Sequence, residues 1–347
     1  MKVHNILFTT QIALEEFILK KKMQSFSNIL VQIFSGTTEP EKFMSVAKTI
    51  KALLPQAEII GAITSGEICR GVMYEGEIAL SFSLFDATRV KSKLYAFDKR
   101  FCVEDIKHDL YEKETKALIV LSDGLRSNTE LYIKKLHDIN EDVTIAGGRA
   151  GDNAAFRKTY VFNEEIYTDN GWVLASLSSQ ELYVNTDYLL NWTPIGKEMI
   201  VTKCDGNILY ELDGIPIVQV YRKYLGDDIV KNLSGSCMSF PLLTSKDGIE
   251  IARDPIAVVE NDAMMYAGNF EKGDVVRFSF ANIEDLTDNL TEPFLALSKY
   301  PSEAVYVYSC AARKALLAEN LKAKLHLLES LAPSVRIFYL WRVFSVQ

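Results

Sequence analysis

The sequence predicts a mixed α/β (α+β) fold of two domains, in which mixed parallel and antiparallel sheets carry flanking helices. The chain has 347 residues, about twice the roughly 150 residues of a typical domain. Its first half alternates β-rich runs with helix-length amphipathic segments, and a hairpin-like β texture begins at Arg157. We therefore expect one domain over residues 25–200 and a second over residues 205–347.

In the first half, short apolar or β-branched runs predict strands, and segments with a 3.6-residue apolar period predict helices. The predicted strands cover Asn28–Phe34, Glu58–Ala62, Gly76–Asp86 and Ala117–Ser122. The predicted helices cover Glu39–Leu54, which Pro40 starts, Val103–Tyr111 and Thr129–Asn140. Because strands alternate with helices, this half should form a largely parallel sheet.

The second half should be richer in strands and turns. Its predicted strands cover Lys158–Phe162, Trp172–Leu177, Glu181–Thr186, Met199–Thr202, Gly248–Ala252, Met264–Gly268, Val275–Phe280 and Ala304–Ser309. Its predicted helices cover Val218–Leu225 and Ala312–Leu331. Turns are expected at Thr168–Gly171, Asp205–Gly206 and Asp213–Gly214, and a break in the chain at Pro194–Gly196.

Composition and charge exclude several classes of function. The net charge of −8 comes from interspersed acids, and a surface of that sign repels phosphate backbones, so a nucleic-acid partner is not expected. Apolar runs such as Ala117–Leu121 are far shorter than the roughly 20 residues that span a bilayer. Five scattered cysteines without a CxxC pair suit a reducing compartment and form no recognisable zinc site. We therefore expect a cytoplasmic protein without a membrane partner, metal or cofactor.

Five motifs follow one another along almost the whole chain. They are Ile59–Ile68 (IIGAITSGEI), Leu121–Gly124 (LSDG), Ala146–Asp152 (AGGRAGD), Leu212–Pro216 (LDGIP) and Tyr308–Arg313 (YSCAAR). In this order they resemble the FIST N-terminal domain followed by the FIST C-terminal domain. One such motif alone would be weak, whereas five in register make the resemblance specific.

The resemblance to the FIST family implies a sensory input module of bacterial signal transduction that binds a small ligand such as an amino acid. Such modules often accompany histidine kinases, chemoreceptors or cyclic-di-nucleotide enzymes, so the chain would signal to a separate partner of that kind. A haem-binding, nitric-oxide-responsive branch of the family gives an alternative. For axial ligands it would have cysteines and four histidines that lie in no recognisable motif.

The segment from Thr64 to Glu67 offers ligand-binding groups at the carboxyl end of a predicted strand. Thr64 and Ser65 supply hydroxyls, Gly66 supplies backbone freedom, and Glu67 supplies a carboxylate. In open α/β sheets, ligands bind at that edge. The alternative is a tight turn in which glycine serves the backbone geometry and the hydroxyls cap the next element.

Further candidate ligand contacts are Gly148, Gly151, Asp152, Arg253, Ser309 and Arg313. The glycines let a backbone approach a ligand closely, and Asp152 could pair with a ligand amine. The two arginines could hold a carboxylate. A glycine-rich crossing between strands and ordinary ion pairs are the structural alternatives. We expect the ligand to bind in a cleft between the domains.

A competing hypothesis is a hydrolase or transferase with Cys310 or Ser65 as the nucleophile. Cys310 lies where a predicted strand turns into a predicted helix, and a helix N-terminus lowers the pKa of a thiol. A nucleophile also needs a base, and none of the four histidines lies in a catalytic motif. We therefore expect a buried, inert Cys310 and no enzyme. A third hypothesis, a scaffold without a ligand, predicts an exposed apolar patch.

The carboxyl-terminal sequence departs from the family pattern. After the helix that contains Arg313, FIST C-terminal domains usually have a strand with the pattern Phe-Tyr/Thr-x-Tyr-Gly-Glu. Here Phe338–Arg342, back-translated as TTT TAC TTA TGG CGA and read one base later, gives Phe-Thr-Tyr-Gly-Glu. We therefore expect a second domain truncated or frameshifted near residue 336, with two strand edges exposed if that strand is lost. The tail itself still favours extended structure.

Overall fold

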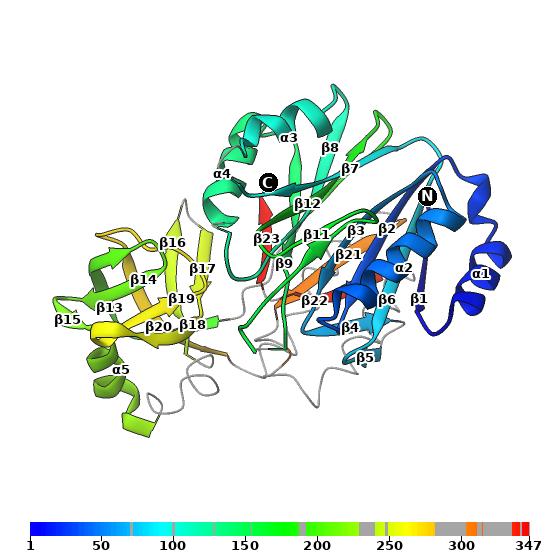
Figure 1. The fold of residues 1–347 in the computed structure, drawn as a ribbon. Coiled ribbons are helices and arrows are strands. Elements are labelled where there is room, and N and C mark those ends of the chain that lie inside the picture. The colour runs from blue at the N-terminus through cyan, green and yellow to red at the C-terminus, as the bar shows by residue number, and fades with distance from the viewer. Residues whose placement is uncertain are drawn as a thin grey trace. The chain divides into compact units, whose positions relative to one another are not determined.

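The computed structural model describes residues 1–69, 72–98, 101–127, 129–153, 155–186, 192–228, 240–246, 249–281, 303–310, 314, 335–340 and 342–346. The chain divides into two compact units. Unit 1 comprises Met1–Asp187 and Phe294–Gln347, and unit 2 comprises Tyr188–Pro293. The fold is mixed α+β with mixed sheets and flanking helices, so the predicted fold class is confirmed (Figure 1).

Unit 1 contains three sheets. The first has the order β1-β6-β2-β3-β10-β11, with bounds Lys2–Leu7, Ile78–Phe85, Asn28–Ser35, Ala57–Ile63, Val161–Phe162 and Tyr167–Thr168. The second has the order β23-β9-β8-β12-β7, with bounds Arg342–Val346, Thr144–Arg149, Thr115–Ser122, Gly171–Ser178 and Arg89–Ala96. The third has the order β21-β22-β4-β5, with bounds Val305–Cys310, Val335–Leu340, Gly66–Cys69 and Val72–Tyr74.

Helices cover the first two sheets of unit 1. They are α1 (Gln11–Lys20), the short 3-10 helix η1 (Met23–Ser25) and α2 (Pro40–Leu53) on the first sheet, and α3 (Val103–Leu110) and α4 (Thr129–Ile139) on the second (Figure 1). In β8, Ala117, Ile119 and Leu121 join the core shared with the first sheet, whereas Leu118 and Val120 join the core beneath α3 and α4. The layers therefore run helix, sheet, sheet, helix. Because β8 is covered on both faces, its central run Ala117–Leu121 is continuously apolar.

Parallel pairing is limited, in the described part of the chain, to β2 with β3, β8 with β9, and β21 with β22. The other strand pairs of unit 1 are antiparallel, so the prediction of a largely parallel sheet is wrong. The physical reason lies in the connections. Helices α2 and α4 carry the chain back from β2 to β3 and from β8 to β9, whereas strands joined without such a crossover lie antiparallel.

Unit 2 is an antiparallel sheet packed against α5 (Ile217–Leu225), whose Ile217, Val218 and Tyr221 lie in its core. The sheet order is β17-β16-β20-β13-β14-β19-β18, with β15 on β14. The strand bounds are Ile249–Arg253, Leu242–Lys246, Val275–Ala281, Trp192–Asp205, Ile208–Leu212, Ala263–Tyr266 and Pro255–Val259 in that order, and Ile215–Pro216 for β15; the 3-10 helix η3 covers Glu260–Asp262.

Two predictions for individual segments are wrong, and a third falls outside the described residues. Residues 181–186 form no strand, because β7 and β8 already occupy both edges of β12, the strand that precedes them. Pro194–Gly196 does not break the chain but lies inside β13, where the pairing register shifts between Ile195 and Met199 and Gly196 adopts a φ of 72°. Such a bulge bends a strand without ending it. The predicted helix Ala312–Leu331 lies outside the described residues, apart from Lys314.

The two carboxyl-terminal strands pair with early strands of unit 1. β22 lies beside β4 as well as β21, and β23 lies beside β9. The predicted extended structure of the tail is therefore confirmed, and the strand edges of β4 and β9 beside it are paired. A frameshift near residue 336 stays a prediction.

Glycine in β9 permits a close backbone approach. A Cβ on Gly147 would lie 1.9 Å from the carbonyl oxygen of Val120 in β8, and the φ of Gly147 is 152°. Gly147→Ala should therefore lower the free energy of unfolding by about 3 kcal/mol or more, measured by urea denaturation, because fixed backbone opposes the new methyl group. Gly76→Ala is the control, since Gly76 has a φ of 81° and no atom within 4 Å of a Cβ. Equal losses in both variants would contradict the clash.

Candidate functional site

The carboxyl ends of β2 and β3 meet at one edge of the first sheet. The two strands are parallel neighbours, and Ser35 lies opposite Ile63 at their ends. The Thr64 amide donates to the carbonyl oxygen of Ser35 at 2.9 Å, and the Gly151 amide donates to that of Ile63 at 3.0 Å. The turn after β3 and the loop after β9 are therefore joined at this edge.

Glu67, in β4, is a fully buried carboxyl beside this edge. Its side chain is 0 % exposed. Thr64 Oγ1 donates a hydrogen bond to Glu67 Oε1, and the Glu77 amide donates to Oε2 at 3.2 Å. Burial raises the pKa of Glu67 to about 7, against the opposing effects of these hydrogen bonds and of the Lys314 charge. The group can therefore exchange a proton near neutral pH.

Lys314 brings a positive charge to the same place. Its Nζ donates to the carbonyl oxygen of Ser65 and lies 2.7 Å from Glu75 Oε1. A Cβ on Gly66 would lie 3.3 Å from this Nζ, so the ammonium packs closely against the backbone between β3 and β4. We call Thr64, Ser65, Gly66, Glu67, Glu75 and Lys314 the edge cluster.

The loop after β9 is shaped by Asp152, which is 8 % exposed. Its carboxylate accepts hydrogen bonds from the backbone amides of residues 156–158 at 2.7 to 3.1 Å. Ser65 Oγ accepts from the Asn153 amide at 3.2 Å, and a Cβ on Gly151 would lie 2.4 Å from Ser65 Oγ. This loop therefore closes onto the edge cluster through backbone groups.

The structure brings together some of the predicted site residues and separates others. Thr64, Ser65, Gly66 and Glu67 lie in the edge cluster, with Gly151 and Asp152 in the adjoining loop. Gly148 lies within β9, opposite Leu121 and Val343. Ser309 of β21 pairs with Tyr339 of β22, and Tyr339 pairs in turn with Gly66 of β4. Ser309 is therefore two strands away from the edge cluster. Arg253 is buried in unit 2, and Arg313 lies outside the described residues.

Sequence reasoning missed Glu75 and Lys314. Lys314 directly follows the motif that ends at Arg313, and a basic residue after a predicted strand was a usable signal. Glu75 precedes a glycine in a turn, and nothing local distinguishes it from other exposed acids. Only the folded chain places it beside Lys314.

The LSDG motif serves the fold at the carboxyl end of β8. Asp123 is 0 % exposed, and its carboxylate accepts from the backbone amides of residues 125–127 and Gly171. The Arg149 guanidinium donates to the carbonyl oxygens of Asp123 and Ser127 at 3.4 and 3.3 Å. Burial lowers the pKa of Arg149. These contacts fix the loop between β8 and α4.

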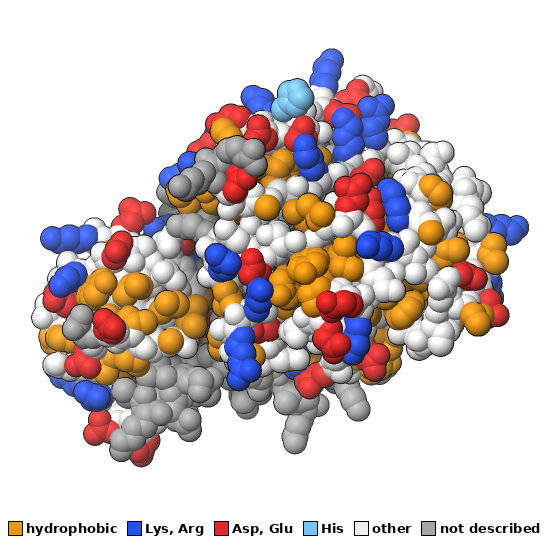
Figure 2. Space-filling model, viewed as in Figure 1, with side chains coloured by type: hydrophobic (Ala, Val, Ile, Leu, Met, Phe, Trp, Pro, Cys, Tyr) orange, Lys and Arg blue, Asp and Glu red, His pale blue; other side chains and the backbone are white. Residues whose placement is uncertain are grey.

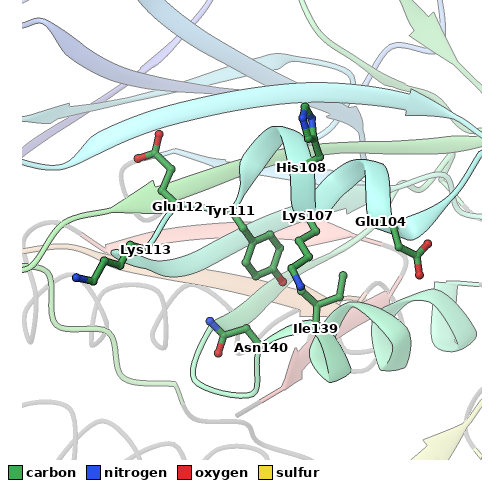
Figure 3. Close-up of a pocket in the computed structure, with 8 residues that line it drawn as sticks. All are labelled: Glu104, Lys107, His108, Tyr111, Glu112, Lys113, Ile139 and Asn140. Atoms are coloured by element: carbon green, nitrogen blue, oxygen red, sulfur yellow. The ribbon is translucent and has the colours of Figure 1, made fainter.

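A cavity of about 600 Å³ lies between α3 and the end of α4. Figure 3 shows Tyr111 and Lys107 directed toward Ile139 and Asn140, whereas His108 points away. The lining contains none of the predicted site residues, and five of its residues are exposed, namely Glu104, Lys107, His108, Lys113 and Asn140. Small-molecule sites are usually enclosed and largely apolar, so this cavity is the weaker candidate.

The described residues offer no metal centre, because no three His, Cys, Asp or Glu side chains gather in one place there. His4, His108 and His137 lie in β1, α3 and α4, and His326 lies outside the described residues. Cys310 ends β21 and is half-buried rather than buried as predicted, since β21 is the edge strand of its sheet.

The visible surface mixes acidic and basic side chains without a large patch of one sign (Figure 2). In the part of the chain that the structure describes, no helix has the length and apolar content to cross a membrane.

Two family models match consecutive parts of the chain. The FIST N domain matches residues 29–215, and the FIST C domain matches residues 218–338. No curated protein in the comparison matches the chain significantly. The second match ends within β22.

The raised pKa of Glu67 predicts a pH-dependent stability difference. An unfolded Glu67 releases its proton near pH 4.5, whereas the folded one keeps it until about pH 7, so the contribution of Glu67 to stability falls between these values. Glu67→Gln stays neutral. The free energy of unfolding of this variant, minus that of the wild type, should therefore increase by about 3 kcal/mol from pH 4.5 to pH 8.

Urea denaturation across this pH range measures the difference. Glu16→Gln, on an exposed position of α1, is the matched control. A difference for Glu67→Gln that stays constant with pH, or an equal increase for the control, would contradict the assignment.

Proposed function

Because the chain belongs to the FIST family, whose domains are generally sensory, signal-transduction domains that bind small ligands, we propose that unit 1 binds an amino-acid-like ligand at the edge cluster. The ligand takes its place beside the carboxyl ends of β2 and β3, the position at which open α/β sheets hold ligands.

The burial of polar groups in the edge cluster carries this proposal. Thr64, Ser65 and Glu67 are 1 %, 3 % and 0 % exposed, so an ionisable carboxyl and two hydroxyls lie together out of contact with solvent. A carboxyl that burial holds near neutral pKa destabilises the fold whenever it is charged. Groups perturbed in this way gather at functional sites more than elsewhere.

The edge cluster and its adjoining loop suit a ligand with both an ammonium and a carboxylate. Glu67 and Glu75 are acceptors for the ammonium, and the Ser65 hydroxyl is a donor for the carboxylate. Thr64 supports binding by holding Glu67 through its hydroxyl. Asp152 supports binding through the loop that it shapes, since its carboxylate already accepts three backbone amides. Of the other candidate contacts, Gly151 lies in this adjoining loop.

Ligand binding then changes the population of conformations that a separate partner recognises. The partner is a signalling protein such as a histidine kinase or a cyclic-di-nucleotide enzyme in the cytoplasm. The family's sensory role supports this assignment.

A thermal-shift screen with the twenty amino acids tests the proposed function. At least one amino acid should raise the Tm of the wild-type protein with increasing concentration, because a ligand stabilises the folded state by about 2.7 kcal/mol at a hundred times its Kd. Thr64→Val should abolish this shift. Thr244→Val, which alters a buried threonine of unit 2, should keep it. No shift with any amino acid, or an unchanged shift in Thr64→Val, would refute the proposal.

A further inference from the structure

The Lys314 ammonium lies in a cradle of oxygen atoms within the edge cluster. It donates to the carbonyl oxygen of Ser65 and pairs with the Glu75 carboxylate at 2.7 Å. The buried Glu67 acts on it through charge. The Lys314 side chain is 17 % exposed, whereas that of Glu75 is 61 % exposed. The Ser65 side of the cradle is thus buried within unit 1, whereas its Glu75 side is open to solvent.

The chemistry of the cradle selects a primary ammonium. A carbonyl and a carboxylate accept hydrogen bonds, and an ammonium has three N–H donors on a small, rotatable centre. Gly66 lets this centre come close, since a Cβ there would lie 3.3 Å from Nζ. A planar guanidinium needs acceptors in a fork, and a quaternary ammonium has no N–H to donate. Neither fits these acceptors as well.

We propose that this cradle is an ammonium subsite, which Lys314 itself fills in the present structure and which the primary ammonium of a ligand takes by displacing it. The inference rests on the proposed function and adds the atoms that would hold the ligand's amino group. Lys314 is then an internal competitor of the ligand. Binding releases the contact between Lys314 and the turn that joins β3 to β4, and this change is available for a partner to read.

An ordinary ion pair would behave differently. A pair between Lys314 and a largely exposed glutamate contributes little stability in water, and its loss would create no selective binding of another molecule. Only a subsite predicts that a free amine replaces the missing side chain. The two interpretations therefore differ in a measurable way.

Chemical rescue of Lys314→Ala tests the subsite. The substitution removes the atoms from Cγ to Nζ, which correspond to n-propylammonium. The variant should lose a few degrees of Tm, and n-propylammonium chloride should restore most of this loss in a saturable manner. n-Propanol, tetramethylammonium and sodium chloride at matched ionic strength should restore much less. The wild-type protein should show a smaller shift, because its own lysine fills the subsite.

A second substitution checks the carboxylate wall. Glu75→Gln combined with Lys314→Ala should weaken the n-propylammonium effect several-fold, since one of the two acceptors loses its charge. Glu77→Gln, in the same turn, is the matched control and should leave the effect unchanged. Equal rescue by n-propanol, or no rescue by n-propylammonium, would overturn the proposal.

A labelling experiment decides the matter if Lys314→Ala does not fold. In Glu75→Gln alone, acetylation of Lys314 by an N-hydroxysuccinimide ester should be several-fold faster than in the wild type, read by peptide mass spectrometry. Lys48, on α2, is the internal reference. An unchanged Lys314 rate would show that Glu75 does not hold the ammonium, and the subsite would be refuted.

The two proposals fail in different ways. Rescue by n-propylammonium without any amino-acid shift in the wild type would leave the ammonium subsite standing and remove the amino-acid ligand. A Tm shift of the wild type with an amino acid, without rescue of Lys314→Ala by n-propylammonium, would support the amino-acid ligand and refute the ammonium subsite.

Discussion

The parallel pairing of β2 with β3 places the carboxyl ends of both strands at one edge of a sheet that is covered on its two faces. Thr64, Ser65 and Glu67 lie buried just beyond these strand ends. The turn at Thr64 and the loop at Gly151 meet there through backbone hydrogen bonds. Every contact of the edge cluster depends on this alignment, because a one-residue slip would turn each side chain of β3 to the opposite face.

The local elements that carry a strong pattern could be predicted from the sequence. α2 has a proline at its first position and an apolar stripe, and β8 is an unbroken apolar run. β9 was not predicted as a strand, because Gly147 and Gly148 have low β-propensity and only the approach of β8 explains them. Within the site, the motif from Thr64 to Glu67 was visible, whereas its contacts with Glu75 and Lys314 were not. They join segments that are distant in sequence.

Glu67 and Lys314 show two solutions to the problem of burying charge. Glu67 is sealed from solvent, and its pKa rises until the neutral form is accessible near pH 7. Lys314 lies partly buried, with the Ser65 carbonyl and the Glu75 carboxylate as partners in place of water. The two groups also act on each other, since the lysine charge favours the ionised glutamate. A change at Lys314 therefore alters the protonation equilibrium of Glu67.

The position of β22 and β23 in the chain has a consequence for biosynthesis. Their partners β4 and β9 leave the ribosome before unit 2, whereas these two strands are translated after it. The described strands of unit 2 are translated in between and pair with one another. Unit 2 can thus finish folding on the nascent chain while β4 and β9 still present open edges, which attract other strands. Contrary to the usual order, in which the amino-terminal unit folds first, unit 1 begins before unit 2 and is completed after it.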